Sequence, residues 1–176
     1  MEAAVLECFA HVLPPATFVE DVIDQPARAQ FEAFLDDHRR ELNSCLDGLT
    51  EQQARRSLVR SQTTLLGLVK HATFVEKVWF HSRVAGVPRA ELGLPDTVDE
   101  SFVLDPHDTV ESVRAAFLAA CEHSRTVAAS HELDEEFPWH QGPVSLRYVY
   151  AHLVAELARL AGHGDILVEQ IRSRRS

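Results

Sequence analysis

The sequence predicts an all-α fold, an antiparallel four-helix bundle with a long crossover between the second and third helices. Two observations predict it. Four segments repeat apolar residues every three or four positions, the period of an amphipathic helix, and no segment shows a convincing strand alternation. Because four such helices cannot bury their apolar faces singly, we expect them to pack around one core.

The chain has the length and composition of one domain with a buried core, since 45% of its 176 residues are apolar. Residues 1–25 contain Pro14-Pro15 and an uneven apolar pattern. We therefore expect an N-terminal extension, with a short helical piece near residues 18–23, that packs on the main domain. Residues 26–176 are expected to form the bundle.

The first two helices have recognisable ends. Pro26 suits a first helical turn and Gly48 a C-terminal stop, while Thr63 or Thr64 can cap the second helix, which ends before Gly86. The inward stripe of the second helix consists of Thr64, Gly67, Leu68, His71, Val75 and Val78, and its charged residues on other faces are Lys70, Glu76 and Lys77.

The second half of the chain contains two loops and two helices. Residues 87–107 hold two prolines and several acidic side chains without periodicity, so they read as the long crossover. Asp108 or Thr109 can cap the third helix. After a loop rich in proline and glycine, the fourth helix starts near Ser145 and carries Glu156 among its inward residues.

Charge and hydropathy exclude several classes of function. The formal net charge of −10 would repel phosphate backbones and anionic lipid, and no basic cluster is large enough to override it. No apolar run approaches the ~20 residues that a membrane span needs. Three scattered cysteines give neither a disulfide framework nor a thiolate zinc site. We therefore expect a cytoplasmic protein that binds neither nucleic acid nor membrane.

Two ionisable residues occupy positions where apolar ones are expected. His71 lies in the middle of the inward stripe of the second helix, and Glu156 lies on the inward face of the fourth. A buried carboxylate is costly unless it is paired, hydrogen-bonded or bound to a cation. Imidazole and carboxylate on facing helices are suitable ligands for zinc, nickel, manganese or iron.

A catalytic metal site needs a third protein ligand, and two histidines of the fourth helix are candidates. His152 lies four residues before Glu156 and His163 seven residues after it, with His163 slightly better aligned on the same face. The alternative is that His71 is a core histidine and that Glu156 pairs with Arg159, with Arg147 or with a histidine across the bundle. No nucleophile motif, phosphate loop or dinucleotide fingerprint is present.

Two segments carry a family resemblance. The run TLLGLVKH at residues 64–71, followed by Trp79-Phe80, resembles the second-helix signature of the DinB-like superfamily. The run SLRY at residues 145–148, with the segment from His152 to Leu167, resembles its fourth-helix signature. The likeness is greatest to the actinobacterial branch related to mycothiol-dependent maleylpyruvate isomerase, and it covers the chain from about Pro26 to Ile171.

The resemblance implies a four-helix bundle that holds a divalent metal, zinc or nickel, through a histidine of the second helix and two residues of the fourth. His71 and Glu156 match two of those positions. The third falls on Leu160, which has no donor atom. Either His163 or His152 substitutes for it, or this member has lost the metal.

Two functions follow as expectations. The first is a metal-dependent thiol transferase or isomerase that activates a low-molecular-weight thiol such as mycothiol. The second is a metal-free bundle that binds a small ligand or a protein partner, including a second copy of itself as a homodimer. The vacant third ligand position at Leu160 favours the second function, and the family resemblance favours the first.

Overall fold

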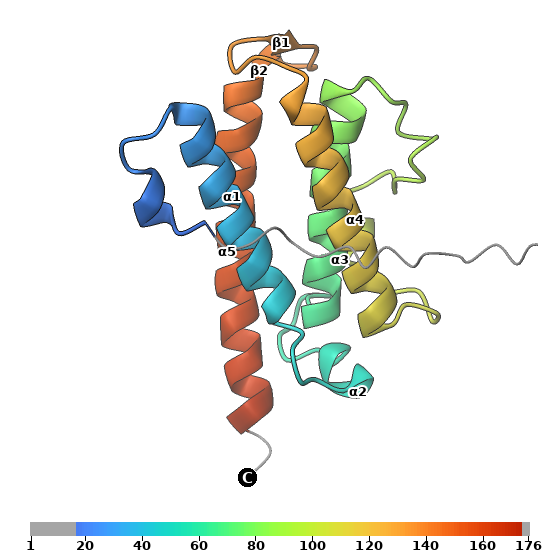
Figure 1. Cartoon of the computed structure of the whole chain (residues 1–176). Helices are drawn as coiled ribbons and strands as arrows, with labels where there is room; N and C mark the ends of the chain where they lie inside the picture. The colour runs from blue at the N-terminus through green and yellow to red at the C-terminus, as the bar shows by residue number, and fades with distance from the viewer. Residues whose placement is uncertain (1–16, 174–176) are drawn as a thin grey trace, which may run out of the picture.

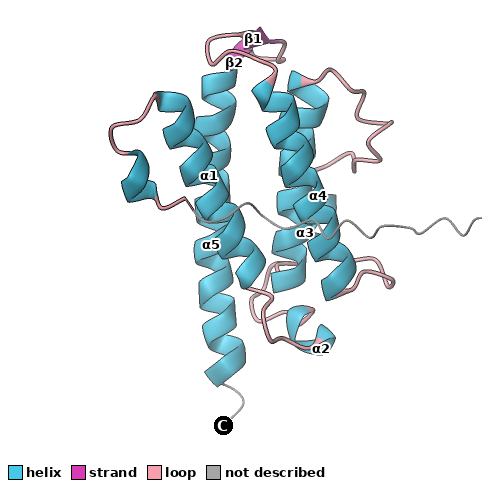
Figure 2. Ribbon diagram, in the orientation of Figure 1, coloured by secondary structure: helices cyan, strands magenta, loops and turns pink. Residues whose placement is uncertain are grey.

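The computed structural model describes residues 17–173, and this part of the chain is mostly helical (Figures 1 and 2). The all-α class is therefore confirmed at that level. Most of the predicted extension, residues 1–16, lies outside the described residues. The four long helical segments are α1 (Ala27–Ser44), α3 (Leu65–Glu76, continued by η2, Lys77–Val84), α4 (Val110–Ala129) and α5 (Leu146–Ser173).

The helices pack as two pairs that run in opposite directions. α1 lies along α5 and α3 lies along α4, and within each pair the two helices point the same way (Figure 1). The expected antiparallel relation therefore holds between the pairs and not within them. The cause is the crossover, which carries the chain back past the length of α3 before α4 begins.

The helix ends follow local chemistry that was readable in the sequence. Thr64 caps α3, with its hydroxyl oxygen accepting from the backbone N–H of Gly67 at 2.9 Å. Thr109 caps α4 through a reciprocal capping box with Ser112. These contacts select Thr64 and Thr109 from the two alternatives predicted at each helix start. Beyond α3, Gly86 takes a positive φ of 74° after the last helical turn.

Several short elements complete the described chain. The 3-10 helix η1 (Val19–Val22) confirms the helical piece expected near residues 18–23. A short α2 (Glu51–Ala54), η3 (Asp99–Phe102) and a hairpin of β1 (Glu136–Phe137) with β2 (Val144–Ser145) were not predicted. Two-residue strands cannot show an alternating pattern, which is why the expectation of no strand was wrong.

Helix α3 is the most buried of the long helices, and this corrects one expectation. Glu76 was placed on a face away from the inward stripe, and the structure buries it completely. The stripe containing His71 faces α5 and the crossover, whereas Glu76 faces α1 and forms a salt bridge with Arg39. A helix surrounded on several sides has no free face for a charge, so Glu76 needs a buried partner.

The second half of this helix is wound as a π-helix over Lys77–Val84. Such turns are rare, cost hydrogen-bond quality and are frequent at functional sites. Here the wider turn carries Trp79, His81 and Arg83. Among the described residues, no helix is both long enough and apolar enough to span a bilayer.

Candidate functional site

His71 and Glu156 meet across the interface between α3 and α5. The Nε2 atom of His71 lies 3.7 Å from Oε1 of Glu156. The His71 side chain is 4% exposed and that of Glu156 is 20% exposed, so the pair sits at the edge of the core with the carboxylate toward solvent. The helical period thus placed both residues correctly, and the structure brings them together.

The imidazole of His71 is held in one orientation by the crossover. Its Nδ1 atom lies 2.6 Å from the hydroxyl of Ser101, and its ring stacks on Phe102 with 4.0 Å between ring centroids. The Ser101 hydroxyl itself donates to the carbonyl of Val98. A hydroxyl has only one hydrogen to give, so the Ser101 oxygen must accept from Nδ1–H. This network assigns the neutral tautomer of His71 with its lone pair on Nε2.

The sequence contains a signal for this part of the crossover that was overlooked. Thr97 and Glu100 have T-x-x-E spacing and exchange hydrogen bonds in the manner of a capping box, which starts η3. The turn delivers Ser101 and Phe102 to His71. Gly67 allows the close approach, because a Cβ at that position would lie 3.0 Å from the carbonyl oxygen of Phe102.

Two acceptors therefore face each other at the centre of the site. Burial lowers the pKa of His71, and the neighbouring Glu156 only partly opposes this shift, so the ring is neutral near neutral pH. A separation of 3.7 Å is too long for a hydrogen bond. It suits two donors to one cation, because Zn–N and Zn–O distances of about 2.1 Å allow two ligand atoms of one tetrahedral site to lie between three and four ångströms apart.

The remaining carboxylate oxygen of Glu156 accepts from Arg159 on the next turn of α5. Arg159 is largely exposed, with 61% of its side chain open to solvent. This contact confirms the alternative pairing with Arg159, but it engages only Oε2 and leaves Oε1 directed at His71. Arg147, the other predicted partner, instead binds Asp134.

The two candidate third ligands lie in different surroundings. His152, one turn before Glu156, packs its ring on Trp79 at 4.3 Å between centroids, and burial lowers its pKa while Glu156 opposes that shift. His163 is exposed and lines a separate surface cavity with Thr63 and Ile166. The preference for His163 is not supported, because two helical turns separate it from Glu156 by about 10 Å along the axis.

The described residues do not complete a metal site by themselves. Within residues 17–173 no group of three or more His, Cys, Asp or Glu side chains is arranged to hold a metal ion. Leu160, at the third position implied by the family resemblance, is buried with 4% exposure. The protein therefore supplies two adjacent donors and an apolar side chain where a third donor would be.

An aromatic cluster of Trp79, Trp139 and Tyr148 borders His152. The guanidinium of Arg83 lies over the ring of Trp79 at 4.1 Å and over that of Trp139 at 5.4 Å. These residues come from η2, from the loop that joins the two strands and from α5. Their assembly was not predicted, since no periodicity relates a loop tryptophan to a helix.

The comparison with known families gives a single clear result. The sequence model of the family described as mycothiol-S-transferase matches residues 30–173, which includes α3, α4, α5 and all but the first three residues of α1. The chain belongs to the mycothiol-S-transferase family. This membership confirms the resemblance to the DinB-like superfamily and its mycothiol-related branch. No curated protein matches the chain. His71, Glu156 and Leu160 all lie within the part matched to the mycothiol-S-transferase family.

Proposed function

We propose that the protein is a thiol S-transferase or isomerase, acting on a low-molecular-weight thiol of the mycothiol type, with its reactive centre at His71 and Glu156 on a DinB-type four-helix bundle. The observation that carries the proposal is that Nε2 of His71 and Oε1 of Glu156 face each other at 3.7 Å while Ser101 binds the Nδ1 side of the ring. Membership in the mycothiol-S-transferase family supports the reaction class. A cytoplasmic location stays a prediction.

The donor set fits a divalent cation, zinc or nickel, held by His71 and Glu156, with His152 or water completing the coordination. When bound, such a cation lowers the pKa of a coordinated thiol and makes thiolate available at neutral pH. The chain itself provides the orientation. Ser101 and Phe102 fix the His71 ring with Nε2 toward Glu156, as outer-shell partners of metal-binding histidines commonly do.

A second candidate function is a metal-free bundle that binds a small ligand, with a homodimer as one form of it. Leu160 favours this candidate, because an apolar side chain stands where a third ligand is implied. The ion pair of Glu156 with Arg159 also favours it, since a carboxylate compensated by a guanidinium has less need of a cation.

Calorimetric titration of the chelator-treated full-length protein with zinc and with nickel tests the proposal. We expect one ion per chain, and Glu156→Gln should weaken binding at least about tenfold because the replacement amide is a poor ligand. Glu135→Gln is the matched control, since it removes a carboxylate that pairs with His131 on the surface. Absence of binding, or equal binding in Glu156→Gln, would overturn the cation site.

Thiol transfer is measured separately with mycothiol and an electrophilic acceptor. The zinc-loaded protein should catalyse transfer, and Glu156→Gln should lose that activity. Saturable binding of mycothiol without either ion binding or transfer would support the metal-free alternative.

A further inference from the structure

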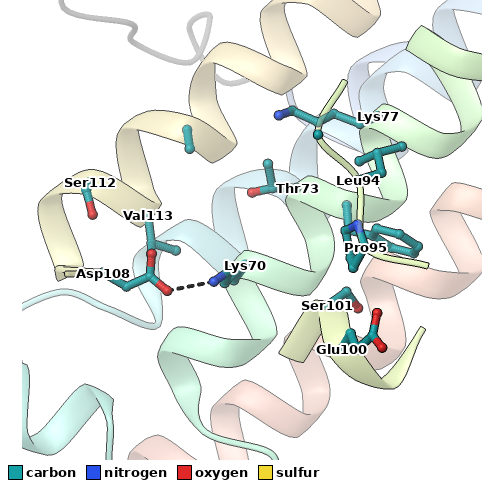
Figure 3. A pocket seen from close by; sticks show the side chains of 13 residues that line it. Lys70, Thr73, Lys77, Leu94, Pro95, Glu100, Ser101, Asp108, Ser112 and Val113 are labelled. Atoms are coloured by element: carbon teal, nitrogen blue, oxygen red, sulfur yellow. Dashed lines mark hydrogen bonds and ion pairs between the residues drawn. The ribbon is translucent and has the colours of Figure 1, made fainter. Parts of the chain in front are cut away.

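A second cavity of about 490 Å³ lies between α3, the first half of α4 and the crossover (Figure 3). This volume is in the range of small-molecule sites. Two parallel helices form one side of it, and the crossover around Leu94 and Pro95 forms the other. Its walls come from segments that share no periodic pattern, so the cavity could not be predicted from the sequence.

The only two lysines of the chain, Lys70 and Lys77, both line this cavity. They lie on one side of the same helix, about 10 Å apart along its axis. The charge of Lys70 is already balanced, since its Nζ atom donates to Asp108 at 2.7 Å and to the carbonyl of Val103 at 2.9 Å. Among the described residues, Lys77 has no hydrogen bond and no ion pair.

The acidic side chains of the cavity are also engaged. Asp108 receives hydrogen bonds from Lys70 and from the backbone N–H of Asp105, and Glu100 receives them from the backbone N–H groups of Asp96 and Thr97. Lys77 is therefore the one charged group of the cavity lining that lacks a partner within residues 17–173. Although the net charge of the chain is −10, this cavity therefore contains an ammonium group that is available to a negatively charged ligand.

The hydroxyl groups of the lining limit the charge of the ligand. Thr73 donates to the carbonyl of Val69, Ser112 takes part in the capping box of α4, and Ser101 lies between His71 and Val98. None of them has a hydrogen to spare. Because Asp108 balances the charge of Lys70, one uncompensated ammonium group remains, and it matches a single negative charge. A phosphate dianion would require more donors and more positive charge.

The rest of the lining is apolar and includes Phe74, Leu94, Pro95 and Val113. We infer that this cavity binds an amphipathic monocarboxylate, with the carboxylate on Nζ of Lys77 and the apolar body against Phe74, Leu94 and Pro95. Burial of the apolar body supplies most of the affinity, and the ammonium group selects the anion.

This site is distinct from the proposed reactive centre but adjoins it. Ser101 and Phe74 line the cavity and also contact the His71 ring, through the hydrogen bond to Nδ1 and through ring stacking at 5.9 Å. Glu156 is on the opposite side, at Nε2. The cavity therefore borders the Nδ1 side of His71 through Ser101, and neither His71 nor Glu156 is part of its lining.

Octanoate is the probe for this inference, with octan-1-ol as the neutral ligand of equal length. Calorimetry on the full chain should show one octanoate bound per chain and at least about tenfold weaker binding of octan-1-ol. Lys77→Met should weaken octanoate binding by a similar factor, and Lys77→Arg should retain it. The control Arg114→Met removes a cation that pairs with Asp47 outside the cavity, and it should leave binding unchanged.

A second variant tests the location without changing charge. Ala116→Phe fills the cavity and should abolish octanoate binding while the helical circular dichroism spectrum is retained. In methyl NMR spectra, octanoate should shift the signals of Leu94 and Val113. Equal affinity in Lys77→Met, equal affinity for octan-1-ol, shifts confined to other methyl groups, or no saturable binding of octanoate would each overturn the inference.

Discussion

Two pairs of ionisable residues use the same central helix and differ in how completely their hydrogen-bonding groups are satisfied. On one face, Arg39 binds Glu76 through two hydrogen bonds of 2.7 Å, and both side chains are buried. On another face, His71 and Glu156 lie 3.7 Å apart without a hydrogen bond between them. The first pair is closed and the second is open.

The closed pair belongs to a larger network. Asp36 accepts from Arg39 and from Arg125, and burial, which opposes its ionisation, is outweighed by these two guanidinium groups, so the pKa of Asp36 is lowered. Burial likewise opposes the charge on Arg39, yet Glu76 raises the pKa of that guanidinium well above its usual value. When every charged group of a buried network has a partner, the network makes the core rigid and leaves no unpaired charge to bind a ligand.

The open pair brings two potential ligand atoms, Nε2 of His71 and Oε1 of Glu156, within 3.7 Å of each other. Its components are individually oriented, His71 by Ser101 and Glu156 by Arg159, but they do not satisfy each other. Preorganised groups that lack their last partner are characteristic of binding and catalytic sites. On geometry alone, the Arg39–Glu76 pair is therefore complete, whereas the His71–Glu156 pair keeps the unused acceptor capacity that the proposed site requires.

The largest expected effect concerns the closed pair. Arg39→Met should lower the free energy of unfolding by about 3–5 kcal/mol, because it leaves Glu76 charged and buried without a partner. Urea denaturation at neutral pH measures the change. Arg114→Met, which breaks the more exposed pair with Asp47, should cost less than about 1 kcal/mol. Similar losses in the two variants would remove the distinction drawn for Arg39.

Much of this arrangement was predictable from the sequence because it depends on local periodicity. The four long helices, the caps at Thr64 and Thr109, and the inward positions of His71 and Glu156 all follow from spacing along single helices. These features need no knowledge of which segment packs against which.

Most of the failures depend on distances between segments, which local periodicity does not describe. Glu76 was placed away from the inward stripe because its partner, Arg39, lies 37 positions away in the chain. Ser101 reaches His71 through an irregular turn that no period describes. The alignment of His163 considered only its angle around the helix axis and ignored the rise between turns.

The next largest effect is expected when a third metal ligand is added to the open pair of His71 and Glu156. Leu160→His places an imidazole one turn after Glu156, at the position where the family resemblance implies a ligand. We expect zinc affinity to rise at least about tenfold, measured by competition with a chromogenic chelator. Leu157→His, on the fully buried neighbouring position, is the control and should give no gain. An unchanged affinity in Leu160→His would contradict the idea of a site that has lost one ligand.

Acid should lower the stability of the fold by protonating His81, which is buried in η2. Burial lowers the pKa of His81, the hydrogen bond to the carbonyl of Ala120 opposes this shift, and the nearby His123 adds to it. Between the ordinary pKa of about 6.5 and the lower folded value, the unfolded chain binds more protons, so stability falls as the pH falls.

His81→Gln removes this titration while keeping a donor for the Ala120 carbonyl. The dependence of unfolding free energy on pH, from about pH 7.5 to about pH 5.5, should become shallower by at most about 1.4 kcal/mol per pH unit. It should not vanish, because burial lowers the pKa of His71 and of His152 as well. Identical pH profiles for the variant and the natural protein would exclude His81 as a source of acid sensitivity.

The smallest expected effect is the most direct test of the comparison. Glu156→Gln in metal-free protein should change the free energy of unfolding by less than about 1 kcal/mol, because the carboxylate is partly exposed and, within residues 17–173, its permanently charged partner is the exposed Arg159. The same substitution, Glu156→Gln, should reduce the increase in melting temperature that zinc produces. Strong destabilisation without metal would mean that Glu156 is a structural residue like Glu76, and the open pair would then lose its claim to function.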